Sequence, residues 1–591
     1  MSSSTVKWEP RCTIAEADKI ICAPGTLYEL DTLLIDGRLQ RVYKNLWPSL
    51  RAFWLAAFDL YKDRTYVVLG KQKYTYSEMA DRSGKAAYHF AKVYGVKKGD
   101  RVGICSRNIP EYLMAFWACH LLGAVTVLVN AWLPTDQMVH CLANTQCKLV
   151  ILDFERADRL EESVKILVKK SGATGVLVFP GHPTKSHWKG MRPWIMVNDE
   201  RRDDVERFLR TDPQIGPEDN ASIFFTSGTT GPPKGVLSTQ RQFLTNVLNV
   251  MVPRHRAYLR RGEKIPVVDA RSPQSSMLLS IPFFHVRVLT SLTMTVTLGG
   301  GKLALMHKWD VKDAVKIIRQ ERLTAAGGVP TMAVELVESD LVGYPLEAIS
   351  FGGAPTPHLF PARARSVFAN VNLIHGYGMT ESNSLAASIA GEDCPAHPTS
   401  CGLGLPVTEI RIVEDGKVLA SGQVGEIWIR GPNVMQGYWL DPEATDKVVT
   451  KDGWLMSGDS GYMDEEGFLY LRDRIKDIII RGGENINSIT VENALFTDGV
   501  LEAVAVGIPD NRLGELVAAV VSVKASERHR ITESVLIELA RSRLPSFAVP
   551  VMVLVQDELP HNQAGKPLKK IIREAAAQEW QKRGGKTVSK L

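Results

Sequence analysis

One short segment, residues 226–236, concentrates the residue types that bind phosphate groups. It reads Thr-Ser-Gly-Thr-Thr-Gly-Pro-Pro-Lys-Gly-Val, with three glycines, four hydroxyl side chains and one lysine in its first ten residues. Glycines let the backbone approach a ligand closely and turn its amides toward it. The hydroxyls add hydrogen-bond donors, and Lys234 adds a positive charge. The segment follows the apolar run 223–225, and its composition indicates a loop that holds a polyphosphate.

Residue spacing excludes two common phosphate-binding loops. A Walker loop would need glycine at position 233 and a serine or threonine after its lysine, but this chain has Pro233 and Gly235. The Gly-x-Gly-x-x-Gly fingerprint of dinucleotide-binding proteins is also missing from the segment. A flexible surface turn of small residues is the remaining alternative. The two prolines and the lysine at fixed offsets argue against it.

A second glycine-rich segment, residues 376–382, reads Gly-Tyr-Gly-Met-Thr-Glu-Ser and follows the apolar run 371–374. Its glycines allow Tyr377 to present a flat ring, and the hydroxyl of Thr380 suits a phosphate. The carboxylate of Glu381 suits a Mg²⁺ ion that nucleotide phosphates help to hold. By itself, the segment is equally compatible with a glycine-rich turn around a buried tyrosine.

These two segments, with further motifs in the same order, resemble the acyl-adenylate-forming (AMP-binding) superfamily. That superfamily includes acyl-CoA synthetases, 4-coumarate-CoA ligases, beetle luciferases and the adenylation domains of peptide synthetases. The resemblance covers the chain from about residue 70 to about residue 570. It is nearest to fungal-type peroxisomal acyl-CoA synthetases and 4-coumarate-CoA ligase-like enzymes, some of which serve secondary-metabolite or toxin pathways.

The resemblance implies a set of nucleotide-binding residues. The first segment would grip the pyrophosphate, and Tyr377 would stack on adenine. Asp459 would accept the ribose hydroxyls, with help from Arg474, and Glu381 would be the magnesium ligand. The implied nucleotide-binding residues are Thr226, Ser227, Gly228, Thr229, Thr230, Gly231, Lys234, Gly353, Ala354, Pro355, Gly376, Tyr377, Gly378, Thr380, Asp459, Arg474 and Lys566. The implied catalytic residues are Lys566, Thr380, Glu381 and His285.

Residues 282–285, Pro-Phe-Phe-His, resemble the aromatic-histidine element that lies near the substrate carboxylate in the family. A single histidine after an apolar strand is more often a core residue. Relatives usually carry small residues, often glycine, just beyond this histidine, whereas this chain has Val-Arg-Val at 286–288. Arg287 would narrow the acyl tunnel, pair with a polar group of the acid, or point to solvent, and the sequence leaves these alternatives open.

Two motifs near the C-terminus imply different steps of one reaction. Lys566 follows Gly565 in a segment that resembles the catalytic-lysine motif of the superfamily. Gly482, Gly483 and Glu484 match the loop that faces the CoA tunnel during thioester formation, and Lys476 matches the hinge position. Because the lysine and the loop cannot both face the site at once, we expect the C-terminal domain to rotate about Lys476 between steps.

The elements that must position these motifs alternate between strands and helices from about residue 70 to 230, which predicts an α/β domain of mostly parallel sheets. Strand and turn character from 407 to 440 predicts a small β subdomain. We expect a large N-terminal AMP-binding domain, residues 1–474, and a small mobile α+β C-terminal domain, residues 475–591. Residues 251–275, rich in arginine, proline and serine, predict a solvent-exposed connection.

Composition limits the class of protein. With 45% hydrophobic and 23% charged residues, a chain of 591 residues is an ordinary globular protein with more than one core. The net charge of +6 is small and lies largely in the tail, so no nucleic-acid partner is expected. The eight cysteines contain no Cys-x-x-Cys pair, which is typical of a reducing compartment and argues against a structural zinc site.

Three segments bear on where the protein resides. The first residues lack the apolar core of a signal peptide. Residues 112–133 are long and apolar enough to suggest a membrane span, but Pro110 marks a helix start and Gly123 its end, so we expect a buried helix, a turn and a buried strand. Ser589-Lys590-Leu591 reads as a peroxisomal address and implies the peroxisomal import receptor as a partner.

Together the motifs predict a peroxisomal, ATP-dependent acyl-CoA synthetase. It would join a fatty or related carboxylic acid to AMP, release pyrophosphate, and transfer the acyl group to CoA, with Mg²⁺ as the metal. A ligase that loads a carrier protein and a luciferase-like oxidase remain alternatives. A nucleotide-binding pseudoenzyme is disfavoured because every charged motif residue is present, namely Lys234, Glu381, Asp459, Arg474 and Lys566.

Overall fold

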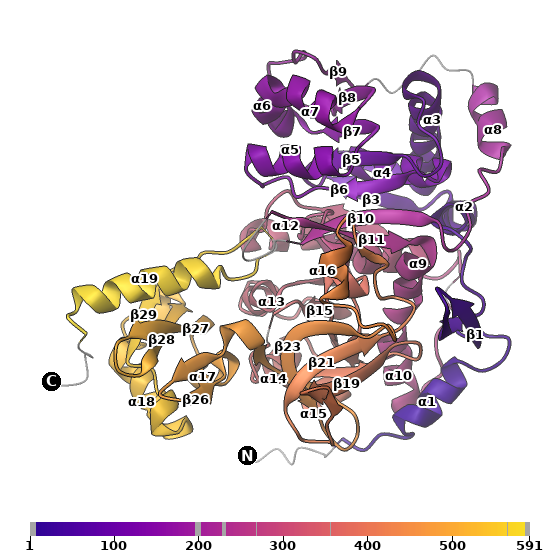
Figure 1. Ribbon diagram of the computed structural model, residues 1–591. Coiled ribbons are helices and arrows are strands. Elements are labelled where there is room, and N and C mark those ends of the chain that lie inside the picture. Colours follow the sequence, from indigo (N-terminus) through magenta and orange to yellow (C-terminus); the bar gives the residue numbers. More distant parts are fainter. Residues whose placement is uncertain are drawn as a thin grey trace.

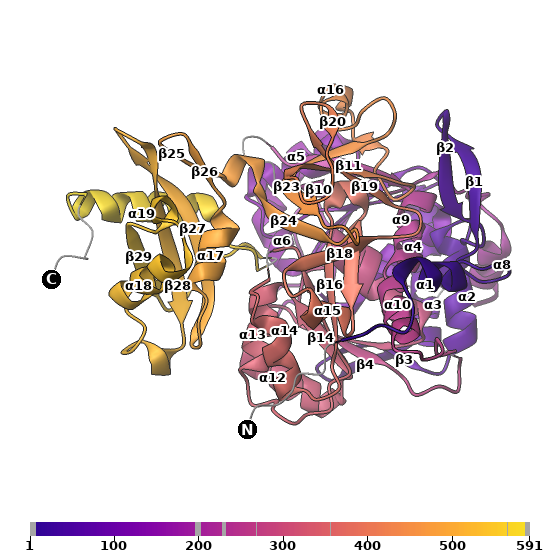
Figure 2. The ribbon, with the colours of Figure 1, turned by 90° about the horizontal axis from the view of Figure 1, so that it is seen from below.

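The computed structural model describes residues 8–194, 202–226, 232–267, 269–354, 356–563 and 565–585. The chain folds into a large lobe and a smaller lobe beside it, which the C-terminal residues form in light orange and yellow (Figure 1). The view from below shows the same separation, with α17 (Ser488–Leu495) on the side of the small lobe that faces the large one (Figure 2). The architecture confirms the predicted α/β class, with a large parallel-sheet region followed by a small mixed one.

The first sheet of the large lobe has eight strands in the order β22-β11-β10-β6-β5-β7-β8-β9. All neighbours from β10 to β9 pair in parallel, and β11 and β22 close one edge antiparallel. The strands are β5 (Arg101–Cys105), β6 (Val125–Leu128), β7 (Leu149–Leu152), β8 (Gly175–Val178), β9 (Arg192–Pro193), β10 (Asn220–Thr226), β11 (Lys234–Thr239) and β22 (Gly437–Tyr438).

The second sheet follows a path of fourteen strands, β20-β19-β21-β23-β24-β18-β17-β16-β15-β14-β12-β13-β3-β4. Its parallel half runs from β16 to β3, and its antiparallel half holds the strands of the predicted β subdomain, so that subdomain continues the edge of the parallel sheet. The strands are β3 (Thr65–Leu69), β4 (Gln72–Thr75), β12 (Ser276–Leu279), β13 (Lys302–Leu305), β14 (Ala325–Gly328), β15 (Ala348–Gly352), β16 (Asn372–Tyr377), β17 (Ala387–Ala390), β18 (Ser400–Gly404), β19 (Glu409–Glu414), β20 (Lys417–Val418), β21 (Gly425–Arg430), β23 (Leu455–Met463) and β24 (Leu469–Arg474).

Helices cover both parallel sheets, and a separate hairpin lies near the N-terminus (Figure 1). The hairpin consists of β1 (Leu30–Ile35) and β2 (Arg38–Tyr43). The helices of the large lobe are α1 (Ile14–Ile21), α2 (Leu50–Tyr61), α3 (Tyr76–Tyr94), α4 (Pro110–Leu122), α5 (Thr135–Asn144), α6 (Phe154–Leu160), α7 (Val164–Ser171), α8 (Arg202–Arg210), α9 (Gln240–Asn249), α10 (Val252–Arg260), α11 (Met294–Leu298), α12 (Val311–Glu321), α13 (Pro330–Val337), α14 (Phe360–Val367), α15 (Asp393–Ala396) and α16 (Pro442–Asp446).

The small lobe is built on a five-stranded sheet that begins just beyond the short 3-10 helix η4 (Ile475–Asp477). A long antiparallel pair forms its centre, β29 adds a parallel strand, and two helices pack beside α17 and the sheet. The elements are β25 (Ile479–Arg481), β26 (Glu484–Ile486), β27 (Val500–Asp510), β28 (Gly514–Val523), β29 (Met552–Gln556), α18 (Glu533–Arg543) and α19 (Lys569–Lys582).

Helix α4 explains the long apolar stretch of the sequence. Pro110 occupies its first turn, and Gly123 ends it at φ +70°, a left-handed conformation that glycine adopts without strain. The whole helix is buried, and its Trp117 stacks on Trp54 of α2 at a ring distance of 4.4 Å. The prediction of a buried helix, a turn and the buried strand β6 is therefore confirmed. Across the described ranges, no helix combines the length and the apolar character that a bilayer crossing requires.

The prediction for residues 251–275 was wrong over its first part. Residues 252–260 form α10, whose buried face includes Arg256 and Arg260. Arg256 pairs with Asp18 of α1 through two contacts of 2.7 Å, and Arg260 pairs with Asp393 of α15 at 2.7 and 2.9 Å. Both arginines are therefore buried partners of carboxylates that are distant in the sequence. The sequence pattern alone does not distinguish a buried, paired arginine from a solvent-exposed one.

The Arg260–Asp393 pair gives a stability prediction. Arg260→Met leaves the buried Asp393 carboxylate without its cation, and we expect a loss of about 3–5 kcal/mol in the free energy of unfolding. The double variant Arg260→Met/Asp393→Leu removes both charges and should recover most of this loss. Urea unfolding of both variants measures the effect, with Arg271→Met, at a side chain 94% exposed, as the control. Equal stability of the single variant and the wild type would contradict the prediction.

Candidate active site

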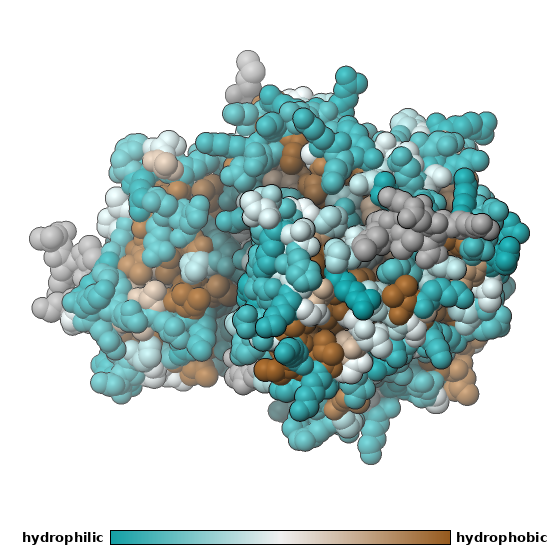
Figure 3. Space-filling model, turned by 90° about the horizontal axis from the view of Figure 1, so that it is seen from above, coloured by the Kyte–Doolittle hydropathy of each residue, from teal (hydrophilic) through white to brown (hydrophobic). Residues whose placement is uncertain are grey.

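A cavity of about 2200 Å³ lies between the two lobes. The space-filling view looks into the hollow that separates them (Figure 3). Strand ends of the large lobe line one side, and residues of α17, β27 and the segment around Lys566 line the other. The sequence-predicted residues that line it are Thr226, Lys234, His285, Gly353, Ala354, Gly376, Tyr377, Gly378, Thr380, Glu381, Asp459, Arg474, Lys476 and Lys566. Folding thus brings motifs from both ends of the chain into one cavity.

The predicted phosphate segment is anchored at both ends at the rim of this cavity. Thr226 ends β10, Lys234 begins β11, and the two residues pair directly in the antiparallel ladder. The predicted site residues Ser227, Gly228, Thr229, Thr230, Gly231 and Pro355 lie outside the described residues.

Glycines allow the backbone to pack closely where β15 and β16 end. A Cβ on Gly378 would lie 1.4 Å from the carbonyl oxygen of Ser384, and one on Gly376 would lie 2.5 Å from Leu385. Gly352 meets the carbonyl oxygen of Gly376 in the same way, at 2.4 Å. No side chain fits at these positions, so the glycines are required to bring Tyr377 to the cavity.

Asp459 of β23 forms a network that spans the site. Its Oδ2 accepts a hydrogen bond of 2.9 Å from the hydroxyl of Tyr377, and its Oδ1 lies 3.4 Å from Nε of Arg474. Burial raises the pKa of Asp459, and the charge of Arg474 and the tyrosine hydroxyl act in the opposite direction. The arrangement presents a carboxylate and a cation side by side, as the recognition of a polar ring such as ribose requires.

Glu381 lies on the 3-10 helix η3 (Thr380–Ser382), which forms the end of the glycine-rich segment 376–382. Its Oε1 accepts a hydrogen bond of 2.8 Å from the hydroxyl of Tyr438, and Nζ of Lys234 lies 5.0 Å from the centre of the same tyrosine ring. Burial raises the pKa of Glu381. These contacts place a carboxylate beside the anchored end of the phosphate segment.

The donor set at Glu381 fits a magnesium ion shared with a nucleotide. Mg²⁺ in such sites takes one or two carboxylates from the protein and its other ligands from phosphates and water. Glu381 supplies one hard oxygen donor in the cavity, and the described part of the chain contains no group of three acidic, histidine or cysteine side chains that would hold a metal alone. The residues therefore suit a metal that arrives with phosphates, with Glu381 as the protein ligand.

Lys566 enters the cavity from the small lobe. Its loop is tied by Asn562, whose backbone amide donates to the carbonyl oxygen of Lys566 at 2.8 Å and whose side-chain oxygen accepts from the Lys566 amide at 3.0 Å. The aliphatic end of Lys566 lies against Gly353, with Cε 3.3 Å from the place of a Cβ. Burial lowers the pKa of Lys566 to about 8, and nearby Asp459 and Glu381 only partly offset this.

His285 lines the cavity at the end of the 282–285 run. Burial lowers its pKa to about 3, and the charges of Lys566 and Arg287 add to the effect. The ring is therefore neutral at physiological pH, so it can exchange hydrogen bonds with a ligand but adds no charge.

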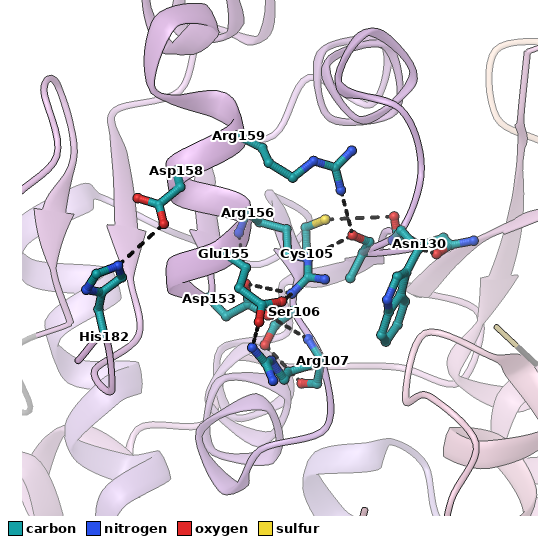
Figure 4. Close-up of polar contacts among 12 residues, drawn as sticks. Cys105, Ser106, Arg107, Asn130, Asp153, Glu155, Arg156, Asp158, Arg159 and His182 are labelled. Carbon is teal, nitrogen blue, oxygen red and sulfur yellow. Dashed lines mark hydrogen bonds and ion pairs between the residues drawn. The ribbon is translucent and has the colours of Figure 1, made fainter. Parts of the chain in front are cut away.

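A buried ion pair connects to this wall through Trp132, and Figure 4 shows the pair, Arg156 and Asp153, among its polar neighbours. Arg156 pairs with Asp153 at 2.8 Å, both side chains being at most 3% exposed, and its Nε donates to the carbonyl oxygen of Ala131 at 2.7 Å. The guanidinium also lies 5.1 Å from the ring of Trp132, which packs against Phe284 at 5.5 Å. The chain of contacts fixes the aromatic residue that precedes His285.

The predicted CoA loop lies away from this cavity. Gly482 and Gly483 form the turn between β25 and β26, with φ values of +59° and +91°, and together with Glu484 they are exposed. Lys476 lies in η4, where the chain passes from the large lobe to the small one. The structure therefore brings Lys566 to the site and leaves the CoA loop outside, as expected if the two serve different conformations.

In the described part of the chain, three side-chain pairs join the lobes beside the cavity, in addition to a hydrogen bond of 2.6 Å from the Ser488 amide to Oδ2 of Asp473. Thr331 of α13 donates to Oε1 of Glu502 at 2.9 Å, and Nε2 of His561 lies 2.8 Å from Oε2 of the same glutamate. A second contact joins Glu338 to Lys524, and a third joins Arg363 to Asp498 at 3.2 Å. We call the Thr331–Glu502–His561 group the lobe latch. Because His561 belongs to the same loop as Lys566, this group also holds the loop that carries Lys566.

Sequence reasoning missed two residues of the site. Tyr438 was included only in a stretch of strand character, and no motif marked it. Glu502 was placed within a strand, and no local signal distinguished it from an exposed acid. Both act through partners distant in the sequence, Glu381 and Thr331 respectively.

Comparison with known proteins supports this picture. Residues 55–439 match the family described as AMP-binding enzyme, and residues 490–566 match the AMP-binding enzyme C-terminal domain. The chain is 31% identical over 541 residues to a long-chain-fatty-acid–CoA ligase of Bacillus subtilis, covering 87% of this chain and 92% of the relative. It is 32% identical over 535 residues to a feruloyl-CoA synthase of Amycolatopsis, covering 89% and 98%.

The fold is also similar to that of a solved structure. The o-succinylbenzoate coenzyme A synthetase of Bacillus subtilis, in complex with ATP and magnesium ion, matches with a TM-score of 0.68 and 26% identity, over 89% of this chain and 99% of that one.

The lobe latch gives a prediction about lobe closure. Glu502→Ala removes the acceptor of the Thr331 hydroxyl, the part of the latch that crosses between the lobes, and we expect the population with separated lobes to rise about fivefold, equivalent to about 1 kcal/mol. Burial alone would lower the pKa of His561, but the hydrogen bond and charge of Glu502 raise it above 6.5. The charged His561–Glu502 contact lies within the small lobe and orients the Glu502 carboxylate toward Thr331; it is complete below pH 6.5 and is lost as pH rises through the raised pKa.

Single-molecule energy transfer between dyes on the two lobes measures the closed fraction. Glu527→Ala is the matched control, because the contact of Glu527 with Arg530, at 2.8 Å, stays within the small lobe, whereas Glu502 also contacts Thr331 of the large lobe. A closed fraction that neither Glu502→Ala nor rising pH reduces would refute the role of the latch.

Proposed function

Since the chain belongs to the AMP-binding enzyme family, we propose that the cavity between its lobes is the active site of an AMP-forming acyl-CoA synthetase. The enzyme joins a carboxylic acid to AMP with release of pyrophosphate and then transfers the acyl group to CoA. One observation carries the assignment of the site. The half-buried side chain of Lys566, from the small lobe, lies in the cavity that Glu381 and Asp459 line from the large lobe.

We assign the nucleotide to the large-lobe side of the cavity. Asp459 and Arg474 would bind the ribose, and the ring of Tyr377, held by its hydrogen bond to Asp459, would lie beside adenine. Lys234 and the phosphate segment that precedes it would hold the pyrophosphate. Magnesium bound to Glu381 and the phosphates would supply additional positive charge.

In the first half-reaction an oxygen of the acid carboxylate attacks the α-phosphorus, and the bond to the pyrophosphate oxygen breaks. Two anions must approach each other, so positive charge at the site lowers the barrier. A cation 4 Å from an anion contributes about 4 kcal/mol near a protein surface. Lys566 lies against Gly353, where the adenine and acyl sites would meet, and so provides this charge without acting as a nucleophile.

In the second half-reaction the CoA thiol attacks the acyl-adenylate carbonyl, and AMP leaves. Gly482, Gly483 and Glu484 lie outside the cavity in this conformation, so we propose that the small lobe rotates about Lys476 to present them. The lobe latch would then have to break and re-form in each turnover. Its polar, partly exposed contacts suit repeated opening better than a large apolar interface would.

The acid is proposed to be a fatty or related carboxylic acid. The relatives include a long-chain-fatty-acid–CoA ligase and a feruloyl-CoA synthase, whose names denote an aliphatic and an aromatic acid. A panel of aliphatic, dicarboxylic and aromatic acids, scored by CoA-dependent AMP release, tests the function. Release of AMP only with a carrier protein would favour the carrier-loading ligase, and oxygen uptake with light emission would favour the oxidase. No AMP release with any acid would contradict the proposal.

Lys566 allows the two half-reactions to be separated. Lys566→Ala should lower ATP–pyrophosphate exchange about 100-fold to 1000-fold, the usual effect of removing one group that stabilises transition-state charge. It should retain thioester formation from supplied acyl-adenylate. Because the ammonium is charged only below its pKa of about 8, kcat/KM for the exchange in the wild type should fall as pH rises above that value.

Lys566→Arg is the control for the pH dependence. Its guanidinium stays charged, so the alkaline fall should vanish even if the rate is lower. An equal loss of both half-reactions in Lys566→Ala, or an unchanged alkaline fall in Lys566→Arg, would show that Lys566 does not act through its charge in adenylation.

Two further proposals concern the cell. Import into peroxisomes through their receptor rests on Ser589-Lys590-Leu591, which lie outside the described residues. Imaging of the protein with and without these residues tests it. A role in secondary-metabolite or toxin biosynthesis rests on the resemblance alone, and metabolite profiling of a strain that lacks the protein tests it.

A further inference from the structure

Arg287 occupies an unusual position in the cavity wall. It begins the π-helical turn η2 (Arg287–Thr293), two residues after His285. One terminal nitrogen donates to the carbonyl oxygens of Gly328 and Gly352, at 2.5 and 3.2 Å, and the other to the hydroxyl of Ser350 at 3.2 Å. These acceptors lie at the carboxyl ends of β14 and β15, where small molecules bind in parallel sheets. The side chain therefore points into the site, and the sequence alternative of a solvent-facing arginine is wrong.

The guanidinium has no anionic partner in the described part of the chain. All three acceptors are neutral, and no carboxylate forms an ion pair with Arg287. Burial is the one cause of its altered pKa, which falls to about 10, so the group stays charged at physiological pH. Arg287 is half-buried, and a cation in this position without a counter-ion is destabilised, because it has lost part of its water and gained no charge in return. An anion from a ligand would remove this destabilisation.

The surroundings of Arg287 indicate which ligand supplies the anion. The cavity that Arg287 enters is also lined by apolar side chains, among them Met277, Ile281, Phe284, Val286, Leu292 and Val329. Such side chains suit the carbon chain of an acid better than the phosphates of ATP. The nucleotide-binding groups proposed above, Lys234 and Arg474, contact Tyr438 and Asp459 instead. We therefore expect the acid, and not ATP, to contact these apolar side chains and Arg287.

Two cations of the site, Arg287 and Lys566, approach neighbouring residues at the end of β15. Arg287 contacts the carbonyl oxygen of Gly352, and Lys566 lies against the next residue, Gly353. If Lys566 binds the reacting carboxylate of the acid, a second anionic group a few carbons along the same acid would reach Arg287.

We propose that Arg287 is a specificity-determining residue that binds a second carboxylate of the substrate, so that the enzyme prefers short dicarboxylic acids to monocarboxylic acids of equal length. The inference rests on the proposed function and names the class of acid. A planar guanidinium with fixed donors recognises a carboxylate through two parallel hydrogen bonds, which a hydroxyl or a methyl group cannot replace.

The experiment compares kcat/KM for CoA-dependent AMP release with α,ω-dicarboxylic acids and with monocarboxylic acids of the same carbon number. The wild type should prefer the diacid. Arg287→Met keeps much of the side-chain volume without the charge, and it should lower kcat/KM for the diacid about 100-fold while affecting the monoacid far less. Calorimetric titration with the diacid alone should show the same loss of affinity. Arg271→Met, which removes an exposed arginine, is the matched control.

Each other outcome overturns the inference in a recognisable way. If the wild type prefers monocarboxylic acids, the inference is wrong. This result needs no variant, so it holds even if Arg287→Met fails to fold. If Arg287→Ala admits longer monoacids and diacids are never preferred, Arg287 is a steric plug. Equal loss with all acids assigns Arg287 to the reacting carboxylate or to ATP. Inactivity of the wild type with every acid contradicts the proposed function itself, and so is distinct from failure of the inference.

Discussion

The site depends on one electrostatic constraint, the burial of the Lys566 ammonium between lobes that carry few compensating charges. Desolvation depresses its pKa to about 8, and Asp459 and Glu381 only partly oppose this. Such a cation attracts phosphate and carboxylate strongly, because little water competes for it. In the proposed reaction the bound anions would therefore stabilise closure of the small lobe, so that ligand binding and lobe position would be linked.

The rest of the structure keeps that cation where it is needed. Glycines at the ends of β15 and β16 let strands and loops approach to distances that a Cβ would prevent, so Tyr377 and Gly353 reach the cavity wall. The lobe latch holds the loop of Lys566 through Glu502 and His561. These contacts are polar, which suits the proposed rotation of the small lobe that would bring Gly482–Glu484 to the cavity.

The sequence predicted most of the site because the motifs are local. Lys566 follows Gly565, and Thr226 and Lys234 bracket the phosphate segment. The spacing of residues within each motif is set by the backbone, so a motif can be recognised without knowing where the fold places it. The fold class followed from the alternation of strands and helices, and α4 with its glycine stop was recognised. The helix over residues 252–260 was not recognised. Its buried arginines are paired with Asp18 and Asp393, which lie far away in the sequence, so no local pattern marks them as buried.

By itself, the sequence determined which chemical groups are present and how those within each motif are spaced, since neighbouring residues are tied by the backbone. Only the tertiary structure decided how the motifs combine. It showed that Lys566 and not Gly482–Glu484 faces the cavity, that Tyr438 supports Glu381, and that Arg287 points into the cavity with no carboxylate partner among the described residues. These outcomes depend on the packing of distant strands and on the desolvation that packing imposes, and no local pattern encodes either.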